Sequence, residues 1–289
     1  MLTFVKKLVK RNKYMMLIFN ILKYLRGKAS VTTIVPVYFD GWKMATGTRT
    51  PWLNGGSNSF SRDFSETDLQ LKAMVSEKKI LLTQFNSQNV TSELEGLTWR
   101  HFIVYWSTTY AIQSTKSERK NLAEFGVCDG LTAYYAISAA NKLKTSFNAY
   151  LYDSWEPMKR DLLLDSEKMS TGSYSYLDLE NTKSNLSHLR VEQLVYNKGY
   201  IPEVFRNAQN PDQLVWIHID LNSAMPTIQV LDKFWDLLEV GGLILLDDFA
   251  WPGYEDTQIQ VEKWIQNKKC NILHLPTGQA IIFKQGGSE

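Results

Sequence analysis

Strand-like and helix-like segments alternate along the chain from Asn121 onward. Short apolar runs typical of buried strands stand at 121–127, 148–154, 193–200, 215–221, 243–249, 271–275 and 280–284. Segments with apolar positions at helical spacing lie between them, at 131–143, 180–189, 226–238 and 258–266. This alternation predicts a mostly parallel sheet covered by helices on both faces.

The helix expected at 226–238 has the clearest amphipathic pattern. Its apolar side chains fall on one stripe, at Ile228, Leu231, Trp235 and Leu238. Pro226 suits the first turn of such a helix, because proline lacks the N–H that the first turn leaves unpaired. Gly241 and Gly242 follow, and since glycine commonly ends helices, we expect this helix to end at the glycine pair.

The pattern before Asn121 is less regular. Residues 46–63 are rich in Gly, Ser, Thr and Asn, which indicates a loop, either a lid over a pocket or a linker. Helical pieces are expected at 66–79 and 92–113. These observations divide the chain into a basic amphipathic helical extension at 1–30, a helical and lid region at 31–115 and an α/β domain at 116–289.

Composition and charge exclude several classes of protein. With 289 residues, of which 44% are hydrophobic and 21% charged, the chain has the make-up of a globular protein. Residues 1–28 hold eight basic side chains and no acidic one. Removing those eight from the 32 basic residues leaves 24 against 30 acidic residues. The remaining chain is therefore acidic and does not suit nucleic-acid binding.

The basic segment at 1–28 allows two interpretations. Its longest apolar run, at 15–22, is far shorter than the roughly 20 residues that span a bilayer. It is either a basic amphipathic helix at a membrane surface or a helix that packs on its own domain or on a second subunit of a homo-oligomer. Cys128 and Cys270 show neither metal-ligand spacing nor a disulfide framework, which predicts a cytoplasmic protein, membrane-peripheral under the first interpretation.

Polar residues stand where the predicted strands end, and open parallel sheets bind ligands at those ends. Glu124, Gly126 and Gly130 lead from the strand at 121–127 into a helix. Glycines there let a backbone approach a ligand, and the helix N-terminus offers N–H groups to an anion. A tight turn without a ligand would use the same residues. Asp153 ends the next strand, where an acid can accept both hydroxyls of a ribose, so the two strand ends predict a pocket for a nucleoside with a charged tail.

Three aspartates stand at two later strand ends. Asp220 closes one strand, and Asp247 and Asp248 close the next. If these strands are neighbours, about 4.8 Å apart, the carboxylates converge and raise one another's pKa unless a cation neutralises them. Such oxygen ligands suit Mg²⁺ or a similar divalent ion; helix capping and pairing with lysines are the alternatives. His218 lies on the same side of its strand as Asp220, where it either orients a ligand or is structural.

The order of these motifs resembles that of a known family. AEFGVCDG, YLYDSWEPM, KGYIPEVF, WIHIDLN and LILLDDFAWPG are similar to the macrocin O-methyltransferase family, class I S-adenosylmethionine-dependent enzymes that act on sugar hydroxyls of natural products. The similarity covers roughly residues 117–284. More distantly, the chain resembles the metal-dependent catechol methyltransferases. The resemblance implies a doubly wound, Rossmann-like α/β sheet, with the methyltransferase domain at 116–289 and a helical N-terminal extension.

The resemblance also implies which residues bind the cofactor and the metal. S-adenosylmethionine would contact residues at the first two strand ends, namely Glu124, Gly126, Val127, Gly130, Asp153, Ser154 and Trp155. The residues after the first strand would line its methionine half, and Asp153 would hold its ribose. The metal, Mg²⁺ or a similar ion, would be bound by Asp220, Asp247 and Asp248.

Asn222 departs from the family pattern. The family has an aspartate at this position, taken as the base that removes the proton of the sugar hydroxyl, and an amide cannot accept that proton at neutral pH. One interpretation is that a metal-bound hydroxyl ionises towards water or His218. A second is that the acceptor is an amine or a more acidic hydroxyl, and a third is binding without turnover. The catalytic set is expected to be Asp220, His218 and Asn222 itself.

The sequence thus predicts an S-adenosylmethionine-dependent, Mg²⁺-dependent O-methyltransferase. Its partner would be a small-molecule or saccharide acceptor, methylated on a sugar hydroxyl in natural-product or polysaccharide biosynthesis. A non-catalytic accessory protein with the same fold is the alternative, which Asn222 favours and the clustered carboxylates oppose. A nicotinamide oxidoreductase is a weaker rival, because the sequence lacks the three-glycine fingerprint of dinucleotide binding.

Overall fold

The computed structural model describes residues 60–85 and 90–286. The basic segment at 1–30 and nearly all of the loop predicted at 46–63 lie outside these residues, so the predictions on them stay predictions. The described residues belong to one compact unit. None of the helices in these two ranges combines the length and the apolar character that a bilayer span requires.

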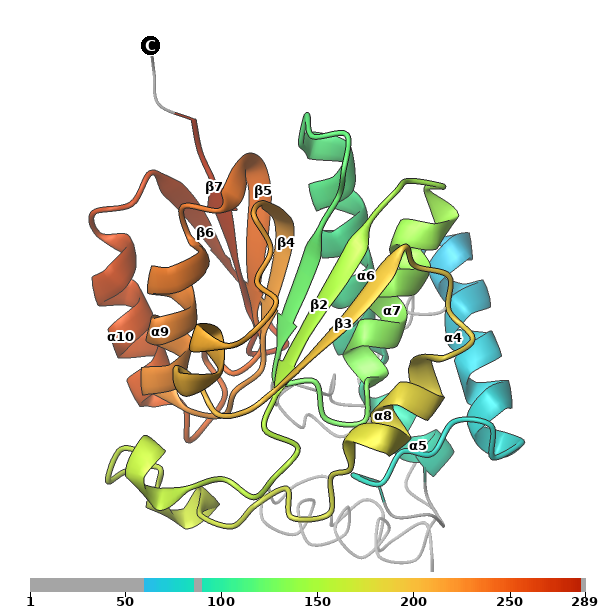
Figure 1. The fold of residues 1–289 in the computed structure, drawn as a ribbon, viewed down its shortest axis with the longest axis horizontal. Coiled ribbons are helices and arrows are strands. Elements are labelled where there is room, and N and C mark those ends of the chain that lie inside the picture. Colours follow the sequence, from blue (N-terminus) through green and yellow to red (C-terminus); the bar gives the residue numbers. More distant parts are fainter. Residues whose placement is uncertain (1–59, 86–89, 287–289) are drawn as a thin grey trace, which may run out of the picture. The chain divides into compact units, whose positions relative to one another are not determined.

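A seven-stranded sheet forms the centre of the described part of the chain (Figure 1). The order of its strands is β3-β2-β1-β4-β5-β7-β6. Their bounds are β1 Leu122–Phe125, β2 Asn148–Asp153, β3 Gln193–Lys198, β4 Leu214–Ile219, β5 Leu238–Leu246, β6 Cys270–His274 and β7 Ala280–Lys284. Strands β1 to β5 pair in parallel, whereas β7 runs antiparallel to both β5 and β6. The predicted mostly parallel, doubly wound α/β sheet is confirmed.

Helices cover both faces of this sheet (Figure 1). Their bounds are α4 Arg62–Ser76, α5 Val90–Gly96, α6 Thr98–Ser114, α7 Leu131–Lys142, α8 Leu179–Leu186, α9 Ala224–Phe234 and α10 Glu255–Ile265. On β5, Leu243 and Leu245 join the core beneath α4, α6 and α7, while Ile244 and Leu246 join the core beneath α9 and α10. Successive side chains of a strand thus pack into the cores on opposite faces of the sheet, which explains why these strands are apolar throughout.

The order of the strands reverses between β1 and β4. From β1 the chain proceeds outward to β2 and β3, then returns to place β4 on the other side of β1. The two strands are parallel, with Phe125 opposite Ile219 at their carboxyl ends. A crevice for ligands forms outside the carboxyl ends at such a reversal. The residues that follow β1 and β4 therefore stand at the expected binding position.

The helix predicted at 92–113 is interrupted. It consists of α5, which ends at Gly96, and α6, which begins at Thr98. Leu97 between them has φ −104° and ψ 5°, outside the helical region. Glycine is a poor helix former, so α5 ends readily at Gly96.

The predicted end of the helix at 226–238 was wrong. Helix α9 ends at Phe234, and the glycine pair lies inside β5. A Cβ on Gly241 would lie 2.6 Å from the carbonyl oxygen of Ser114, the last residue of α6, and one on Gly242 would lie 2.6 Å from that of Val215 in β4. The glycines therefore serve the close packing of β5 against its neighbours, which no local helix rule reveals.

Candidate active site

A cavity of about 460 Å³ opens at the carboxyl edge of the sheet. Its walls include Gly126 after β1, Asp153 at the end of β2, Asp220 after β4 and Asp247 after β5. These residues follow four adjacent strands on either side of the reversal in strand order. The cavity is therefore the crevice in which open α/β sheets bind their ligands.

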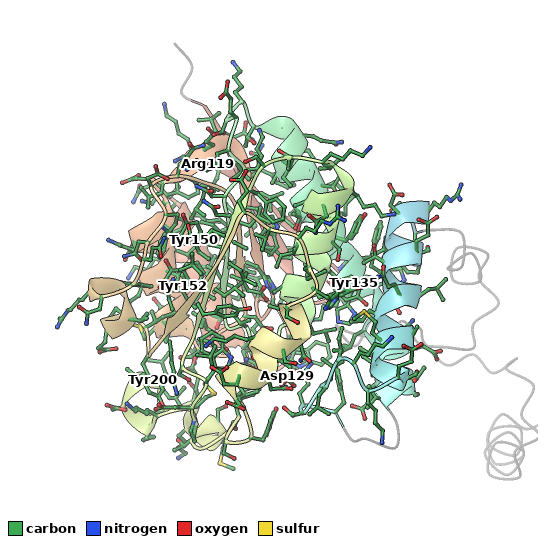
Figure 2. The ribbon with its side chains drawn as sticks, turned by 45° about the vertical axis from the view of Figure 1, so that its right-hand side comes forward. Arg119, Asp129, Tyr135, Tyr150, Tyr152 and Tyr200 are labelled. Atoms are coloured by element: carbon green, nitrogen blue, oxygen red, sulfur yellow. The ribbon has the colours of Figure 1, made fainter. Side chains whose placement is uncertain are left out.

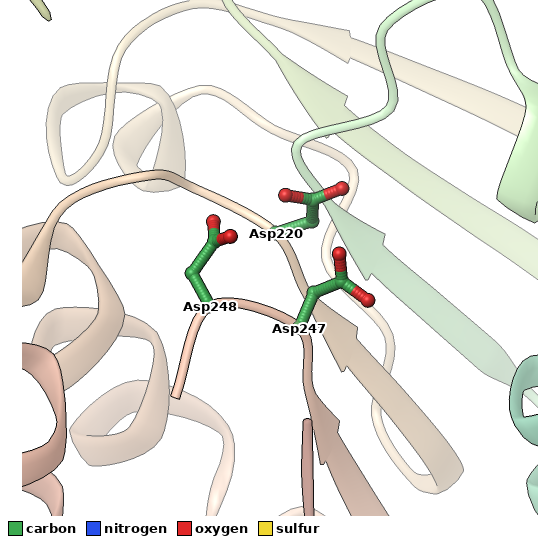
Figure 3. A group of neighbouring side chains, drawn as sticks. All are labelled: Asp220, Asp247 and Asp248. Atoms are coloured by element: carbon green, nitrogen blue, oxygen red, sulfur yellow. The ribbon is translucent and has the colours of Figure 1, made fainter. Parts of the chain in front are cut away.

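Three carboxylates meet in this cavity, at Asp220, Asp247 and Asp248. One oxygen of each lies within 4.8 Å of an oxygen of the other two. Figure 3 shows these side chains extending from two adjacent strand ends around a common space. Their proximity follows from the parallel pairing of β4 and β5, in which Ile219 stands opposite Leu246. Spacing alone would allow one cation to contact all three side chains.

The three carboxyl groups have different affinities for a proton. Burial and the charge of Asp247 raise the pKa of Asp220 to about 6. Burial and the charge of Asp220 raise the pKa of Asp248 well above its usual range. Burial would also raise the pKa of Asp247, but Arg100 and His218 lower it to about 2. The most persistent negative charge of the cluster is therefore on Asp247.

Arg100, in the first turn of α6, supplies a positive charge to this cluster. Its Nε donates to Oδ2 of Asp247 at 2.7 Å, and its Nη2 lies 2.5 Å from Oδ2 of Asp220 and 2.6 Å from Oδ2 of Asp247. The arginine is 9% exposed and also lines the cavity. Burial would lower its pKa, but the two aspartates raise it above its usual range, so the guanidinium stays charged.

Both oxygens of Asp247 are engaged by other side chains. Oδ2 accepts from Arg100, and Oδ1 accepts from Nε2 of Gln279 at 2.7 Å. Nε2 of His218 lies 3.6 Å from the same Oδ1, beyond direct hydrogen-bond distance. A divalent ion needs ligand oxygens at about 2.0–2.6 Å with free lone pairs. The residues therefore do not fit a divalent ion while Arg100 holds its place.

Gly126 brings the end of β1 directly against the end of β4. Its φ is +86°, and a Cβ at this position would lie 1.8 Å from the carbonyl oxygen of Asp220. No side chain fits in that space, and an L-residue also disfavours that φ. The loop predicted to hold the cofactor is thus packed against the strand end that carries the carboxylates.

The carboxylate of Asp153 binds the backbone of two loops. Its Oδ2 accepts from the N–H groups of Val127 and Cys128 at 2.7 and 2.8 Å, and its Oδ1 accepts from the N–H of Trp155 at 2.7 Å. These bonds fix the loop after β1 to the end of β2. A carboxylate has about four acceptor positions, so Asp153, which lines the cavity, retains capacity for a ribose hydroxyl.

Two residues predicted at the site, Glu124 and His218, lie behind the cavity wall. Nδ1 of His218 is 3.2 Å from Oε1 of Glu124, and the hydroxyl of Thr132 donates to the same oxygen. Their exposed fractions are 1% and 0%. Burial would lower the pKa of His218, but Asp247 and Glu124 raise it to about 9. The pair therefore lies next to Asp247, whose negative charge His218 stabilises, and neither residue lines the cavity.

The remaining residues predicted to bind the cofactor shape its loop. Ser154 lines the cavity. Val127 and Trp155 are buried, and Nε1 of Trp155 donates to the carbonyl oxygen of Cys128 at 3.2 Å. Gly130 has φ +85° and begins α7, where a Cβ would lie 3.1 Å from the Leu186 side chain. Val127, Gly130 and Trp155 do not line the cavity and contribute to the geometry of the loop.

Asn222 links the carboxylates to a phenol. It has φ +53°, a left-handed conformation that asparagine tolerates. Its Oδ1 accepts from Oη of Tyr254 at 2.6 Å, and its Nδ2 donates to Oδ1 of Asp220 at 3.4 Å. Its backbone N–H donates to Oδ2 of Asp248 at 3.1 Å. Asn222 therefore orients its neighbours instead of accepting a proton.

Sequence reasoning did not identify Arg100, Gln279 or Tyr254 as site residues. Arg100 is separated from Asp220 by 120 positions, and Gln279 from Asp247 by 32. A signal did exist for the arginine: apart from His101, it is the only basic side chain in α6, TWRHFIVYWSTTYAIQS, which carries no acid. A single charge in such an apolar helix indicates a buried partner.

Comparisons with known proteins support the fold. The sequence matches no protein-family model and no curated protein. The structure is similar to that of the O-methyltransferase NovP, with a TM-score of 0.55 and 14% identity over 66% of this chain and 82% of that chain. CalS11, a calicheamicin methyltransferase, matches with a TM-score of 0.47 and 14% identity over 77% and 93% of the two chains. At such identities the likeness is one of fold, and the chain has the Rossmann-like α/β fold of NovP.

Proposed function

We propose that this chain is an S-adenosylmethionine-dependent O-methyltransferase that acts on a sugar hydroxyl of a saccharide or glycosylated metabolite. The observation that carries the proposal is the cavity that joins the loop after β1 to the carboxylate cluster. One half offers a glycine turn and an acid suited to a nucleoside, and the other offers polar groups suited to an acceptor. The fold shared with O-methyltransferase NovP agrees with this assignment.

The cofactor half of the cavity suits a nucleoside with a positively charged tail. Gly126 lines the cavity, and Asp153 stands at the strand end where a ribose is held. S-adenosylmethionine carries a sulfonium cation, which the neighbouring carboxylates, Asp153 and Asp220, attract. The charge of the wall thus favours the sulfonium form over its neutral product.

In the proposed reaction, an oxygen lone pair of the acceptor hydroxyl attacks the methyl carbon in line with the C–S bond. The C–O bond forms while the C–S electron pair returns to sulfur, which leaves neutral S-adenosylhomocysteine. The hydroxyl proton passes to Oδ1 of Asp220, which lines the cavity beside Asn222 while Oδ2 is held by Arg100. A carboxylate with a raised pKa is suited to this task near neutral pH. Holding the two reactants in one cavity supplies much of the acceleration.

This assignment addresses the missing base at Asn222. The amide donates to Asp220 and so keeps that carboxylate directed towards the acceptor. His218 was the alternative base, but it lies behind Asp247 and outside the cavity wall. An amine or a more acidic hydroxyl as acceptor stays the second candidate, because such a group needs less help from a base.

No step of this proposal passes through a metal. The Mg²⁺ dependence expected from the sequence stays a prediction that the contacts of Arg100 oppose. Membrane contact through residues 1–28, homo-oligomer formation and a cytoplasmic location also stay predictions, since the basic segment on which the first depends lies outside the described residues.

Titration calorimetry tests the cofactor half of the proposal. S-adenosylmethionine and S-adenosylhomocysteine should each bind the purified chain with a Kd in the micromolar range, whereas NAD⁺, the control ligand, should not bind. Binding of NAD⁺ alone would support the oxidoreductase rival, and binding of none of the three would support the accessory-protein alternative. The acceptor is then sought by mass spectrometry, as a methyl gain on nucleotide sugars and glycosides incubated with enzyme and cofactor.

A further inference from the structure

Arg100 neutralises the carboxylates that the sequence assigns to a metal. We infer that its guanidinium is the resident cation of the cluster of Asp220, Asp247 and Asp248, and that the chain binds no divalent ion there. The inference rests on the proposed function only in treating this cluster as part of the active site. It makes Arg100 a positioning residue, because the guanidinium holds Asp220 and Asp247 in place.

The guanidinium of Arg100 is held in position by helix α6, which packs firmly on the sheet. Helix α6 packs against β4 and β5, the strands that carry the aspartates. Nε1 of Trp216 in β4 donates to Oγ of Ser107 in α6 at 2.9 Å, which ties the helix to the sheet. Arg100 stands two turns earlier on the same helix and is 9% exposed. Its position is therefore set by packing in the core.

Arg100 contacts one oxygen of each of two carboxylates that a metal would need, Asp220 and Asp247. Its Nε and Nη2 reach Oδ2 of Asp247, and Nη2 also reaches Oδ2 of Asp220. A planar guanidinium can contact several oxygens at once, because its N–H groups lie in one plane in a fixed fork. The arginine thereby bridges the ends of β4 and β5, as a shared metal ion would.

A divalent ion and the guanidinium compete for this position. An ion about 2.1 Å from Oδ2 of Asp220 would lie within about 4.6 Å of Nη2, given the 2.5 Å separation of that nitrogen from the same oxygen. Two cations at this distance repel each other strongly in a buried site. Gln279 also occupies Oδ1 of Asp247, so this carboxylate cannot turn to a metal without losing a buried hydrogen bond.

Mn²⁺ titration followed by electron paramagnetic resonance tests this inference without any need for the acceptor. The titrations compare the wild type, Arg100→Met and a control, Arg119→Met. Arg119 is exposed and lies at the end of the molecule opposite Tyr200, which lines the cavity (Figure 2). The signal scored is the bound Mn²⁺ that the additional substitution Asp247→Asn removes.

We expect no such Mn²⁺ at micromolar concentrations in the wild type or in Arg119→Met. In Arg100→Met the freed carboxylates should bind one Mn²⁺ at least about tenfold more tightly, because the competing cation is gone. Tight binding of one Mn²⁺ by the wild type, removed by Asp247→Asn, would overturn the inference. So would a folded Arg100→Met variant that gains no affinity. If that variant does not fold, the wild-type titration decides alone.

The outcome is separable from that of the proposed function. Binding of S-adenosylhomocysteine to protein treated with a chelator reports on the cofactor pocket. If the cofactor analogue does not bind while Mn²⁺ is still excluded, the methyltransferase proposal fails and the assignment of Arg100 stands. If the analogue binds and the wild type also takes up Mn²⁺, the reverse holds.

Discussion

The phenol of Tyr254 donates a 2.6 Å hydrogen bond to the side-chain oxygen of Asn222. This bond fixes which way the amide points: its oxygen faces the phenol, so its nitrogen faces Asp220. Both residues line the cavity. Burial and the nearby carboxylates, Asp248 and Asp220 above all, raise the pKa of Tyr254 above its usual range, so the phenol keeps the proton that it donates. The pair therefore acts as an orienting unit, with no basic group of its own.

Replacing Tyr254 by Phe should release the amide of Asn222. We expect the free energy of unfolding to fall by about 1 kcal/mol, the usual net contribution of a part-buried hydrogen bond. Urea denaturation measures the change. Tyr110→Phe is the matched control, since Tyr110 is 36% exposed and should tolerate the loss of its hydroxyl. Equal stability of Tyr254→Phe and wild type would show that the bond contributes little.

Gly126→Ala should destabilise the junction of β1 and β4 severely. The new Cβ would lie 1.8 Å from the carbonyl oxygen of Asp220, and the backbone cannot yield without separating the two strand ends. A loss of about 3 kcal/mol or more, or failure to fold, is expected. Gly172→Ala separates the clash from the backbone strain, because Gly172 has a similar φ of +81° and nothing within 4 Å of its Cβ position. Similar losses in the two variants would contradict the role of the clash.

Asp153→Asn should weaken binding of S-adenosylhomocysteine by about tenfold or more. An amide has one acceptor oxygen in place of two, so it cannot keep the backbone bonds to Val127, Cys128 and Trp155 together. The cofactor loop would lose its anchor as well as its ribose ligand. Calorimetry measures the change, with the exposed Asp212→Asn as control. Unchanged affinity in Asp153→Asn would remove Asp153 from the cofactor site.

His218 should make the stability of the protein depend on pH above neutrality. Its pKa is raised from the ordinary 6.5 to about 9 in the folded protein, so the folded state favours the protonated ring. That stabilisation is fully present below pH 6.5 and is lost as the pH rises through 9, at no more than about 1.4 kcal/mol per pH unit. The free energy of unfolding measured between pH 6.5 and 9 should therefore fall more steeply in the wild type than in His218→Gln.

An exposed histidine provides the control for this measurement. His274→Gln should keep the wild-type slope, because its side chain lies on the surface. If the slope is equally reduced in both variants, or in neither, the pair formed by Glu124 and His218 does not hold a proton as the structure indicates.

The parts of this fold that depend on local pattern could be predicted from the sequence. The alternating segments gave the strands and helices, and the strand ends led to the convergence of Asp220, Asp247 and Asp248. That convergence needs only the adjacency of β4 and β5, which a short βαβ connection favours. Residues that act through their position along a strand were therefore accessible to sequence reasoning.

Features that depend on tertiary approach could not be predicted in the same way. Glu124 and Asp153 stand at neighbouring strand ends, yet one side chain points behind the cavity and the other into it. The pleat and twist of the strands determine which side chain faces the cavity, and neither can be predicted from the sequence. The contact of the cluster with Arg100 could not be predicted either, because the arginine comes from α6, far away in the sequence.

The glycine at position 241 has a consequence for the far end of the fold. Its missing side chain lets the last carbonyl of α6, at Ser114, settle against β5. Arg100 stands fourteen positions earlier, about 21 Å along the helix axis. Because α6 is stiff, a side chain at Gly241 would push its Ser114 end away from β5. The opposite end would then tilt, and there Arg100 contacts two aspartates. The position of Arg100 at the cavity thus depends on a glycine at the opposite edge of the sheet, where a mutational screen of the cavity would not look.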